Sequence, residues 1–303
     1  MELKLEQITK SFGEKQVLRG ISLAVESGKA LGLLGRNGAG KTTAIRIVMG
    51  VFPSDSGAVL LDGRPIDRSK LQIGYLPEER GLYPKKLIME QLLYLASLHG
   101  LSRSQGKAAA MRWLERLGMA EYKDKKLDTL SKGNQQKIQL VATLIADPEI
   151  VILDEPFSGL DPVNAMLLKD IVKELIAAGK IVLFSSHQMN YVEEFCDQIA
   201  ILNGGNLVLS GNIRDIKRSY DRTRILISST QAEQLAAHLR GQLPQVVRSA
   251  ECRGNVLSVH LDQEDSKAAL LRSIAGSGFD VDEVKVYEPS LNDIFVQYTE
   301  EKA

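Results

Sequence analysis

A glycine-rich segment between two apolar stretches carries the strongest chemical signal in this sequence. Residues 35–43 read Gly-Arg-Asn-Gly-Ala-Gly-Lys-Thr-Thr and fit the pattern G-x-x-x-x-G-K-[ST]. Glycines allow successive backbone N–H groups to close on phosphate oxygens, and a helix N-terminus and a lysine charge strengthen that attraction. An ordinary glycine-rich turn would match by chance in about one chain in a hundred of this length. The segment therefore predicts a loop that binds the phosphates of a nucleotide.

The flanking residues have the pattern that such a loop requires. Residues 30–34 form an apolar run short enough for a buried parallel strand, and residues 43–49 read as a helix closed by Gly50. We expect the Lys41 ammonium to contact the phosphates and the Thr42 hydroxyl to bind Mg²⁺. The predicted phosphate-binding residues are Gly35, Asn37, Gly38, Ala39, Gly40, Lys41, Thr42 and Thr43.

Two adjacent carboxylates end a second apolar strand. Residues 150–153 are Ile, Val, Ile and Leu, and Asp154, Glu155 and Pro156 follow. Because side chains alternate along a strand, the two carboxylates point to opposite sides of its end. In P-loop NTPases an acidic residue here holds Mg²⁺, so Asp154 is the candidate metal ligand and Glu155 the candidate general base or water-orienting group. Two solvated acids before a proline turn would be favoured for an isolated pair, but not for one that ends a buried strand and accompanies a phosphate loop.

Residues 130–137, between these motifs, read Leu-Ser-Lys-Gly-Asn-Gln-Gln-Lys, and with them the chain resembles the ATP-binding-cassette (ABC) family of transporter ATPases. The family signature is L-S-G-G-Q. Here Lys132 replaces the first Gly, and Asn134 replaces the Gln. Ser131 and Gly133 are kept, and in the family they face the γ-phosphate across a dimer. The helix expected to begin here can still point its N-terminal dipole at phosphate.

Three further positions match the family in order. Phe12 stands where the family has its adenine-stacking aromatic. Asp161 ends the segment 158–161, which resembles the D-loop, and His187 matches the switch histidine. The resemblance implies that Phe12 and Asp161 belong to the nucleotide site and that His187 contacts the γ-phosphate. The alternatives are simple hairpin packing for Phe12 and a satisfied strand-end histidine for His187.

The segment 73–83, which reads Ile-Gly-Tyr-Leu-Pro-Glu-Glu-Arg-Gly-Leu-Tyr, departs from the family at Glu78, where many relatives carry Gln. A carboxylate at this position can act on Mg²⁺ or on water, so Glu78 is a further candidate metal ligand. This segment and the C-terminal extension are similar to those of the bacterial drug-, sodium- and peptide-export branch of the family.

Charge and hydropathy exclude several classes of protein. The 303 residues include 38 Lys plus Arg and 38 Asp plus Glu, so the chain has no basic footprint and no nucleic-acid partner is expected. The longest apolar run, near residues 140–146, is far below the ~18 residues of a membrane span, and the N-terminus lacks the apolar core of a signal peptide. Cys196 and Cys252 lie far apart in the sequence, which favours reduced thiols in the cytosol.

The order of apolar and polar segments predicts an α/β fold with two domains. We expect residues 1–215 to form a P-loop NTPase core with a parallel sheet, an antiparallel β subdomain and a helical subdomain at about residues 84–147. Residues 222–303 read as a small C-terminal α+β domain of the ferredoxin-like, βαββαβ type. We expect its apolar strands to pair with a second copy of the domain; the alternative is that its own two helices cover them.

Together these features predict an ATPase that uses ATP and Mg²⁺. The resemblance implies the ATP-hydrolysing subunit of an ABC exporter, which forms a homodimer on ATP and drives a separately encoded transmembrane permease. Such a subunit is cytoplasmic and is held at the inner face of the cell membrane by the permease. The alternative is a soluble ABC-type ATPase that acts on ribosomes or DNA, although the chain shows no tandem cassette, long coiled coil or basic arm. Lys41, Glu155 and His187 disfavour a nucleotide-binding module without turnover.

Overall fold

The computed structural model describes residues 1–79, 81–158 and 160–300. Arg80 of the predicted segment 73–83, Gly159 of the segment 158–161 and the end of the predicted domain 222–303 lie outside the described residues. The chain forms two compact units. One comprises Met1–Ile213 together with the helix α10 (Leu291–Thr299), and the other comprises Arg214–Ser290.

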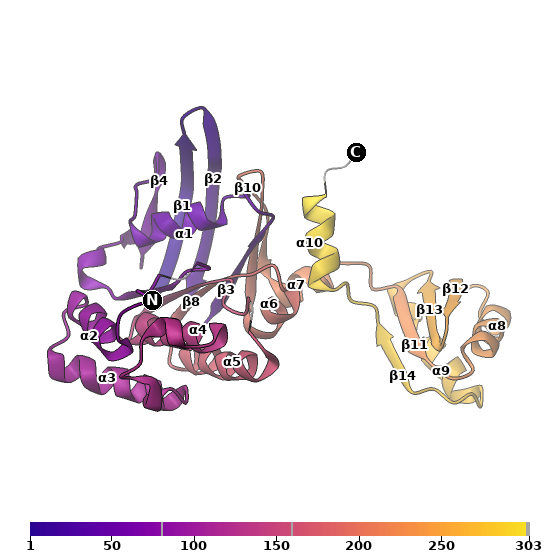
Figure 1. Cartoon of the computed structure of the whole chain (residues 1–303). Coiled ribbons are helices and arrows are strands. Elements are labelled where there is room, and N and C mark those ends of the chain that lie inside the picture. The colour runs from indigo at the N-terminus through magenta and orange to yellow at the C-terminus, as the bar shows by residue number, and fades with distance from the viewer. Residues whose placement is uncertain (80, 159, 301–303) are drawn as a thin grey trace. The chain divides into compact units, whose positions relative to one another are not determined.

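A six-stranded sheet forms the centre of the first unit (Figure 1). Its order is β10-β9-β3-β8-β7-β6, and all neighbouring strands are parallel except β9 and β10. Every residue of β3, β7 and β8 is buried, because both faces of the sheet are covered. This is the parallel sheet expected from the sequence. The strands are β3 Ala30–Gly35, β6 Ile73–Leu76, β7 Ile150–Asp154, β8 Ile181–Ser185, β9 Gln198–Asn203 and β10 Asn206–Asn212.

The two faces of β3 pack against different layers. Leu31 and Leu33 belong to a core that also contains residues of α1 (Lys41–Met49) and of the antiparallel sheet. Gly32 faces the other side, where a Cβ would lie 2.6 Å from the Cγ1 atom of Val192 in the helix α6 (Met189–Phe195). The absence of a side chain therefore lets α6 pack directly on the strand that leads into the phosphate loop.

An antiparallel sheet and a helical block complete the first unit. The sheet has the order β2-β1-β4-β5, and its β1–β2 hairpin ends next to Phe12. The helix α3 begins with a capping box formed by Ser102 and Gln105, and the Trp113 indole N–H donates to the Leu144 carbonyl of α4 at 3.1 Å. The remaining elements are β1 Glu2–Phe12, β2 Lys15–Glu26, β4 Ser56–Leu61, β5 Arg64–Pro65, α2 Ile88–Leu98, α3 Arg103–Arg116, α4 Lys132–Leu144 and α5 Pro162–Ala177. The helix α7 (Ile213–Arg218) begins at the last residue of the stretch Met1–Ile213 and continues into the second unit.

The second unit is a four-stranded antiparallel sheet with two helices, in the sheet order β12-β13-β11-β14. This order and the βαββαβ succession are those of a ferredoxin-like fold. Buried Ile225, Ile227, Leu257 and Val259 form one core with Leu239 and other residues of the two helices. The elements are β11 Arg224–Ser228, α8 Ala232–Gln242, β12 Val247–Arg253, β13 Val256–Leu261, α9 Lys267–Gly276 and β14 Glu283–Val286.

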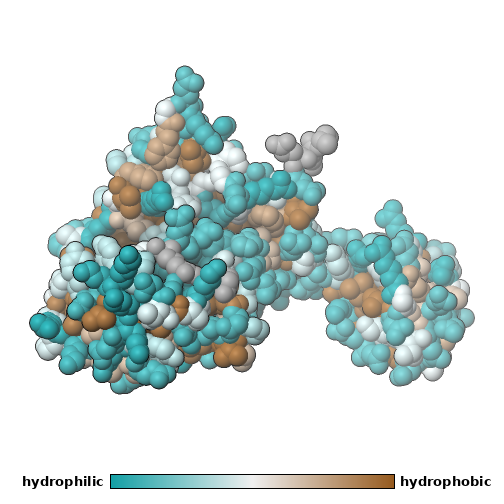
Figure 2. All heavy atoms as spheres, in the orientation of Figure 1, coloured by the Kyte–Doolittle hydropathy of each residue, from teal (hydrophilic) through white to brown (hydrophobic). Residues whose placement is uncertain are grey.

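The structure differs from the sequence-based description of residues 222–303 in two ways. The apolar strands are covered by the unit's own helices, so they do not require a second copy, and the face of this unit seen in Figure 2 is mainly hydrophilic. The last helix, α10, packs on α6, β9 and β3 of the first unit. Leu291 and Ile294 are fully buried there. Helical periodicity reveals such an apolar face but not the core that it joins.

The second unit should depend on its own core. Replacing Leu257 by Ala removes a side chain with 0% exposure, so we expect the free energy of unfolding of this unit to fall by about 2–5 kcal/mol. Val256→Ala is the matched control on the same strand, because Val256 is 41% exposed. Urea denaturation followed with separate probes in each unit measures the effect. An equal loss of stability in both variants would contradict the assignment of this core.

Candidate functional site

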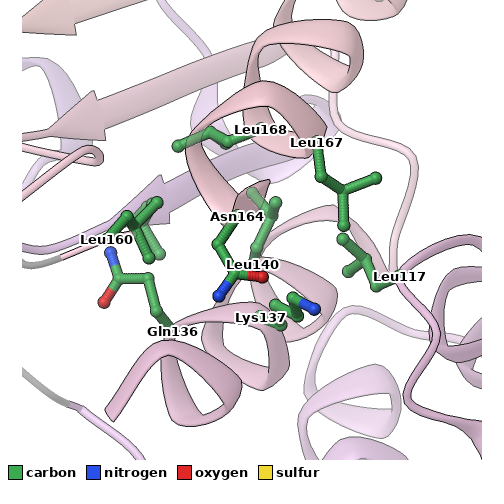
Figure 3. Close-up of a pocket in the computed structure, with 9 residues that line it drawn as sticks. Leu117, Gln136, Lys137, Leu140, Leu160, Asn164, Leu167 and Leu168 are labelled. Atoms are coloured by element: carbon green, nitrogen blue, oxygen red, sulfur yellow. The ribbon is translucent and has the colours of Figure 1, made fainter. Parts of the chain in front are cut away.

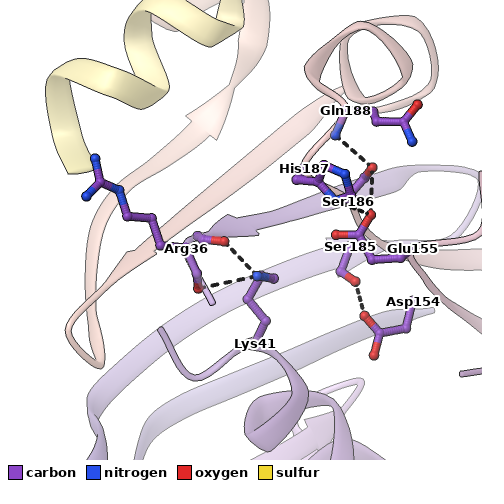
Figure 4. A network of polar contacts seen from close by, with 9 residues as sticks. Arg36, Lys41, Asp154, Glu155, Ser185, Ser186, His187 and Gln188 are labelled. Carbon is purple, nitrogen blue, oxygen red and sulfur yellow. Dashed lines mark hydrogen bonds and ion pairs between the residues drawn. The ribbon is translucent and has the colours of Figure 1, made fainter. Parts of the chain in front are cut away.

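An open cleft of about 700 Å³ lies at the carboxyl ends of β3 and β7. Ligand sites in open α/β sheets form at these strand ends, and the volume is within the range of small-molecule sites. The structure brings the phosphate loop, all three acidic candidates and His187 together in this cleft. Figure 4 shows Lys41, Asp154, Glu155 and His187. The lining residues are Lys15, Val17, residues 35–43, Glu78, Asp154, Glu155, His187 and Phe295.

The phosphate loop turns directly into α1 at Gly40. This residue has a φ of 109°, and a Cβ would lie 2.6 Å from the Cδ2 atom of Leu18, so both conformation and space require glycine. No side chain caps α1, and its first turn contains no acidic residue. The backbone N–H groups at the start of α1 therefore face the cleft as an anion-binding end of the helix.

Lys41, the first residue of α1, reaches back over the loop. Its Nζ donates to the Gly35 carbonyl at 2.6 Å (Figure 4). Burial lowers the pKa of the Lys41 ammonium, and the charges of Glu155 and Asp154 oppose this effect only in part. A bound polyphosphate would favour the charged form, because it brings further negative charge to this ammonium.

Asp154 is buried and is oriented by two hydroxyl groups. The Ser185 hydroxyl of β8 donates to its Oδ1, and the Tyr75 hydroxyl of β6 donates to its Oδ2 at 3.3 Å. Burial, reinforced by the Asp154 charge, raises the pKa of Tyr75 to about 12. Sequence reasoning missed both hydroxyls, although Tyr75 lies in the segment 73–83 and Ser185 stands two residues before His187. Both hydroxyls reach Asp154 because β6 and β8 pair with β7 on either side, which places their residues beside the end of β7.

Glu155 adopts a strained backbone conformation at the end of the same strand. Its φ is 50°, which is uncommon for a residue with a side chain, and it is only 8% exposed. Its Oε2 lies 2.9 Å from Nδ1 of His187 and accepts from the Ser186 hydroxyl at 3.2 Å (Figure 4). The His187 side chain is 70% exposed. Glu155 is thus held against a histidine that projects into the open part of the cleft.

The chemistry of the donor atoms in the cleft suits Mg²⁺. Thr42 offers a hydroxyl, Asp154 and Glu78 offer carboxylates, and all three line the same cleft. Mg²⁺ prefers oxygen donors and takes only one or two protein carboxylates, with phosphate oxygens and waters completing its shell. The described residues contain no group of three or more His, Cys, Asp or Glu side chains that could hold a metal by themselves. Any metal here would therefore depend on the nucleotide for part of its shell.

The loop that carries Glu78 is anchored by Gln139, a residue that sequence reasoning missed. Gln139 is 5% exposed on α4, and its Nε2 donates to the carbonyls of Pro77 at 3.4 Å and Glu79 at 3.3 Å. The sequence pattern could have indicated this contact, because Gln139 is a polar residue between Ile138 and Leu140 on the apolar stretch of a helix. This contact links the helical block to an acidic residue of the cleft.

Ser131, Gly133 and Asp161 do not line this cleft but cap two neighbouring helices. The Ser131 hydroxyl accepts from the Asn134 N–H at 3.3 Å at the start of α4. Asp161 accepts from the backbone N–H of Asn164 at 3.0 Å at the start of α5, and this hydrogen bond lowers the pKa of the Asp161 carboxyl. A Cβ on Gly133 would lie 2.9 Å from the Asn164 Nδ2, so the two helix starts are in close contact here.

A small pocket lies behind these two helix starts. Gln136 and Lys137 of α4 line it together with Leu160 and Asn164, which lie at the start of α5 (Figure 3). Leucine side chains of the same helices, together with Leu76 of β6 and Leu117, form the rest of its wall. The starts of α4 and α5 are therefore packed as one surface rather than as two independent loops.

Phe12 does not line the cleft either. It is 49% exposed, and its ring meets the edge of Phe52 at a centroid distance of 5.4 Å. The Lys10 ammonium lies 5.6 Å from the centroids of both rings. The structure thus shows Phe12 engaged in packing next to the hairpin end.

Comparison with known proteins identifies the family. Residues 18–158 match the protein family described as "ABC transporter", and residues 211–299 match the family described as "ATP-binding protein DrrA1-3-like, C-terminal domain". The protein YhaQ of Bacillus subtilis (strain 168), described as an uncharacterized ABC transporter ATP-binding protein, is 40% identical over 97% of this chain and 97% of its own length. The chain belongs to the ATP-binding proteins of ABC transporters.

Other relatives of this ABC ATPase agree with that assignment. The linearmycin resistance ATP-binding protein LnrL of Bacillus subtilis (strain 168) is 32% identical over 98% of both chains. A solved structure of an ATP-binding subunit of an ABC transporter superposes with a TM-score of 0.67 and 29% identity, covering 72% of this chain and 92% of that one. Among the described residues of this ABC ATPase, no helix is both long and apolar enough to cross a membrane.

The Tyr75–Asp154 contact should make this ABC ATPase sensitive to alkaline pH. The pKa of Tyr75 is raised from 10.0 to about 12, so above the lower value the unfolded chain loses a proton that the folded chain keeps. The free energy of unfolding should therefore fall as pH rises through this window, and Tyr75→Phe should flatten that fall. Tyr94→Phe, at a 54% exposed tyrosine, is the control. Denaturation across this window tests the effect, and equal slopes for both variants would contradict it.

Proposed function

We propose that this ATPase energises an exporter by hydrolysing ATP in the cleft described above. The observation that carries the proposal is the placement of buried Glu155, paired with His187, in the same cleft as the phosphate loop and Lys41. A carboxylate in this position can take a proton from an attacking water while the loop N–H groups and Lys41 bind the phosphates. The retained Lys41, Glu155 and His187 favour turnover over binding alone.

Each predicted site residue has a part in this proposal. The loop residues Gly35, Asn37, Gly38, Ala39, Gly40 and Thr43 contact phosphate oxygens, and His187 contacts the γ-phosphate. Thr42 and Asp154 hold Mg²⁺, with Glu78 as a further ligand or water contact. Bound Mg²⁺ would neutralise charge on the phosphate oxygens. Phe12 packs against Phe52 and does not line the cleft, so a contact with adenine would require its ring to turn away from Phe52.

A second copy of the chain is part of the proposed active form. Ser131, Gly133 and Asp161 lie outside the chain's own cleft, yet α4 begins at Ser131 with its N-terminal N–H groups and dipole available for an anion. A second copy docked head to tail would place these groups over the γ-phosphate and exclude bulk water. Closure of the dimer then couples hydrolysis to movement.

The proposed permease docks on a groove of about 280 Å³ between the loop after β6 and the helical block. Leu82, Leu95 and Ala142 supply apolar lining, and Tyr94 and Leu98 are exposed beside it on α2. Gln139 both lines this groove and anchors the Glu78 loop, so a helix pressed into the groove can act on the cleft. Such docking would hold this subunit at the cytoplasmic face of the membrane.

The direction of transport rests on the relatives. LnrL is named for linearmycin resistance, and a 33% identical protein of Paraburkholderia xenovorans (strain LB400) is named a Nod factor export ATP-binding protein. Export by this chain's complex is the proposal that these names support. The rival, an ABC-type ATPase acting on ribosomes or DNA, finds no support in a chain with equal numbers of acidic and basic residues.

Replacing Glu155 by Gln should stop hydrolysis and leave ATP binding intact. We expect turnover to fall by about 10²–10⁴, because the amide cannot accept the proton of the attacking water. Trapped ATP should then stabilise a dimer, seen by gel filtration with and without ATP. Glu115→Gln, at an exposed position of α3, is the matched control. Near-normal phosphate release by Glu155→Gln would move the catalytic role elsewhere, with Glu78 as the next residue to examine.

A substitution in the groove should prevent binding of the permease. Leu95→Glu places a charge among the groove's leucines, so we expect the protein to leave the membrane fraction of cells that also express the permease of the neighbouring gene. Ala108→Glu adds the same charge on the exposed surface of α3 and should stay membrane-bound. ATPase activity and thermal stability of the purified variants show that folding is retained. If Leu95→Glu stayed in the membrane fraction like the wild type, the groove would not be the docking site of the permease.

A further inference from the structure

The helix α10 is a fixed part of the first unit, although the whole second unit precedes it in the sequence. It contacts α6, β9 and β3, and Leu291 and Ile294 are fully buried in these contacts. At its other end, Thr299 is 2% exposed, and the Asn203 Nδ2 at the end of β9 donates to the Tyr298 carbonyl at 3.2 Å. The helix is therefore anchored at both ends.

Phe295, in the middle of α10, lines the phosphate cleft. Among the described residues of that lining it is the only Phe, Tyr or Trp, and the rest are mostly charged, polar or small. Figure 4 shows the Arg36 side chain reaching from the phosphate loop towards α10, so the helix passes close to the loop. Phe295 thus offers half-buried apolar surface in an otherwise polar site.

Lys15 and Val17 of β2 form a wall of the same cleft that Phe295 lines. With the phosphates in the loop, the nucleoside would have to lie along another part of the lining, and Val17 and Phe295 are the larger apolar side chains there. The β9–β10 turn joins this wall to α10: the Arg19 N–H donates to the Gly205 carbonyl at 2.9 Å, and Asn203 binds Tyr298. The β2 wall and α10 are therefore neighbours at the same part of the cleft.

We propose that the Phe295 ring contacts the base and sugar of the bound nucleotide, so that the C-terminal helix completes the ATP site. Aromatic rings stack on any base, and a partly exposed ring loses little by covering one. Phe12, by contrast, already packs against Phe52 beneath the Lys10 ammonium. The inference rests on the proposed function, because it takes the cleft as the ATP site.

Two ligands separate a nucleoside contact from a phosphate contact. Isothermal titration of the full chain with ATP and with inorganic tripolyphosphate, both with Mg²⁺, gives the two dissociation constants. Phe295→Ala should weaken ATP binding by about 5- to 150-fold, from the usual strength of base–aromatic stacking, and leave tripolyphosphate binding unchanged. Phe295→Tyr keeps a ring and should retain most of the ATP affinity.

Two control variants show whether the effect is specific to the Phe295 ring. Val296→Ala shortens the neighbouring side chain of α10, which does not line the cleft, and should leave both constants unchanged. Lys41→Ala should weaken both ligands, because the lysine contacts phosphate. If Phe295→Ala lowers the melting temperature, Phe295→Leu keeps an apolar side chain in the helix and should still weaken ATP alone.

The outcomes distinguish failure of this inference from failure of the proposed function. Wild-type protein that binds neither ligand would refute the cleft as an ATP site. Normal binding of both ligands by wild type, with an unchanged ATP constant for the folded Phe295 variants, would overturn the contact. An equal loss of ATP and tripolyphosphate affinity would also overturn it, because Phe295 would then act through the phosphate loop.

Discussion

The site depends on the register of three parallel strands. β8 lies between β3 and β7, and Ser185 is paired with Leu33 on one side and with Asp154 on the other. This register sets the carboxylates at the end of β7 level with the strand that opens into the phosphate loop. A shift by one residue would turn the Ser185 hydroxyl to the opposite face of the sheet and leave buried Asp154 without its partner. The fully buried, close-packed strands oppose such a shift.

The cleft is partly pre-organised and partly incomplete. Glu155 is held in a left-handed backbone conformation by the Ser185 carbonyl, the Ser186 hydroxyl and His187, and that strain is maintained by a buried strand end. Ser131 and Gly133 instead cap a helix outside the cleft. In the proposed dimer, these groups of a second copy would complete the site, so hydrolysis would depend on the approach of the partner.

The C-terminal part of the chain contains two physically different pieces. Residues 214–290 bury their own apolar strands beneath α8 and α9, whereas α10 packs on the first unit. Because α10 is buried at Leu291 and Ile294, removing the whole C-terminal segment would also expose part of the nucleotide-binding unit. The roles of the two pieces therefore have to be tested by separate substitutions, because one truncation would remove both.

Local pattern determined most of the chemistry. The phosphate loop, the carboxylate pair after β7 and the parallel sheet could be read from sequence, because each depends on neighbours within a few residues. The tertiary structure decided which distant groups share the cleft. Phe295 lines it, whereas Tyr75 and Gln139 support residues of it from outside, and all three do so through contacts between residues far apart in the chain. A periodic apolar face shows that α10 is buried somewhere, but only the folded chain shows that its partner is the nucleotide-binding unit.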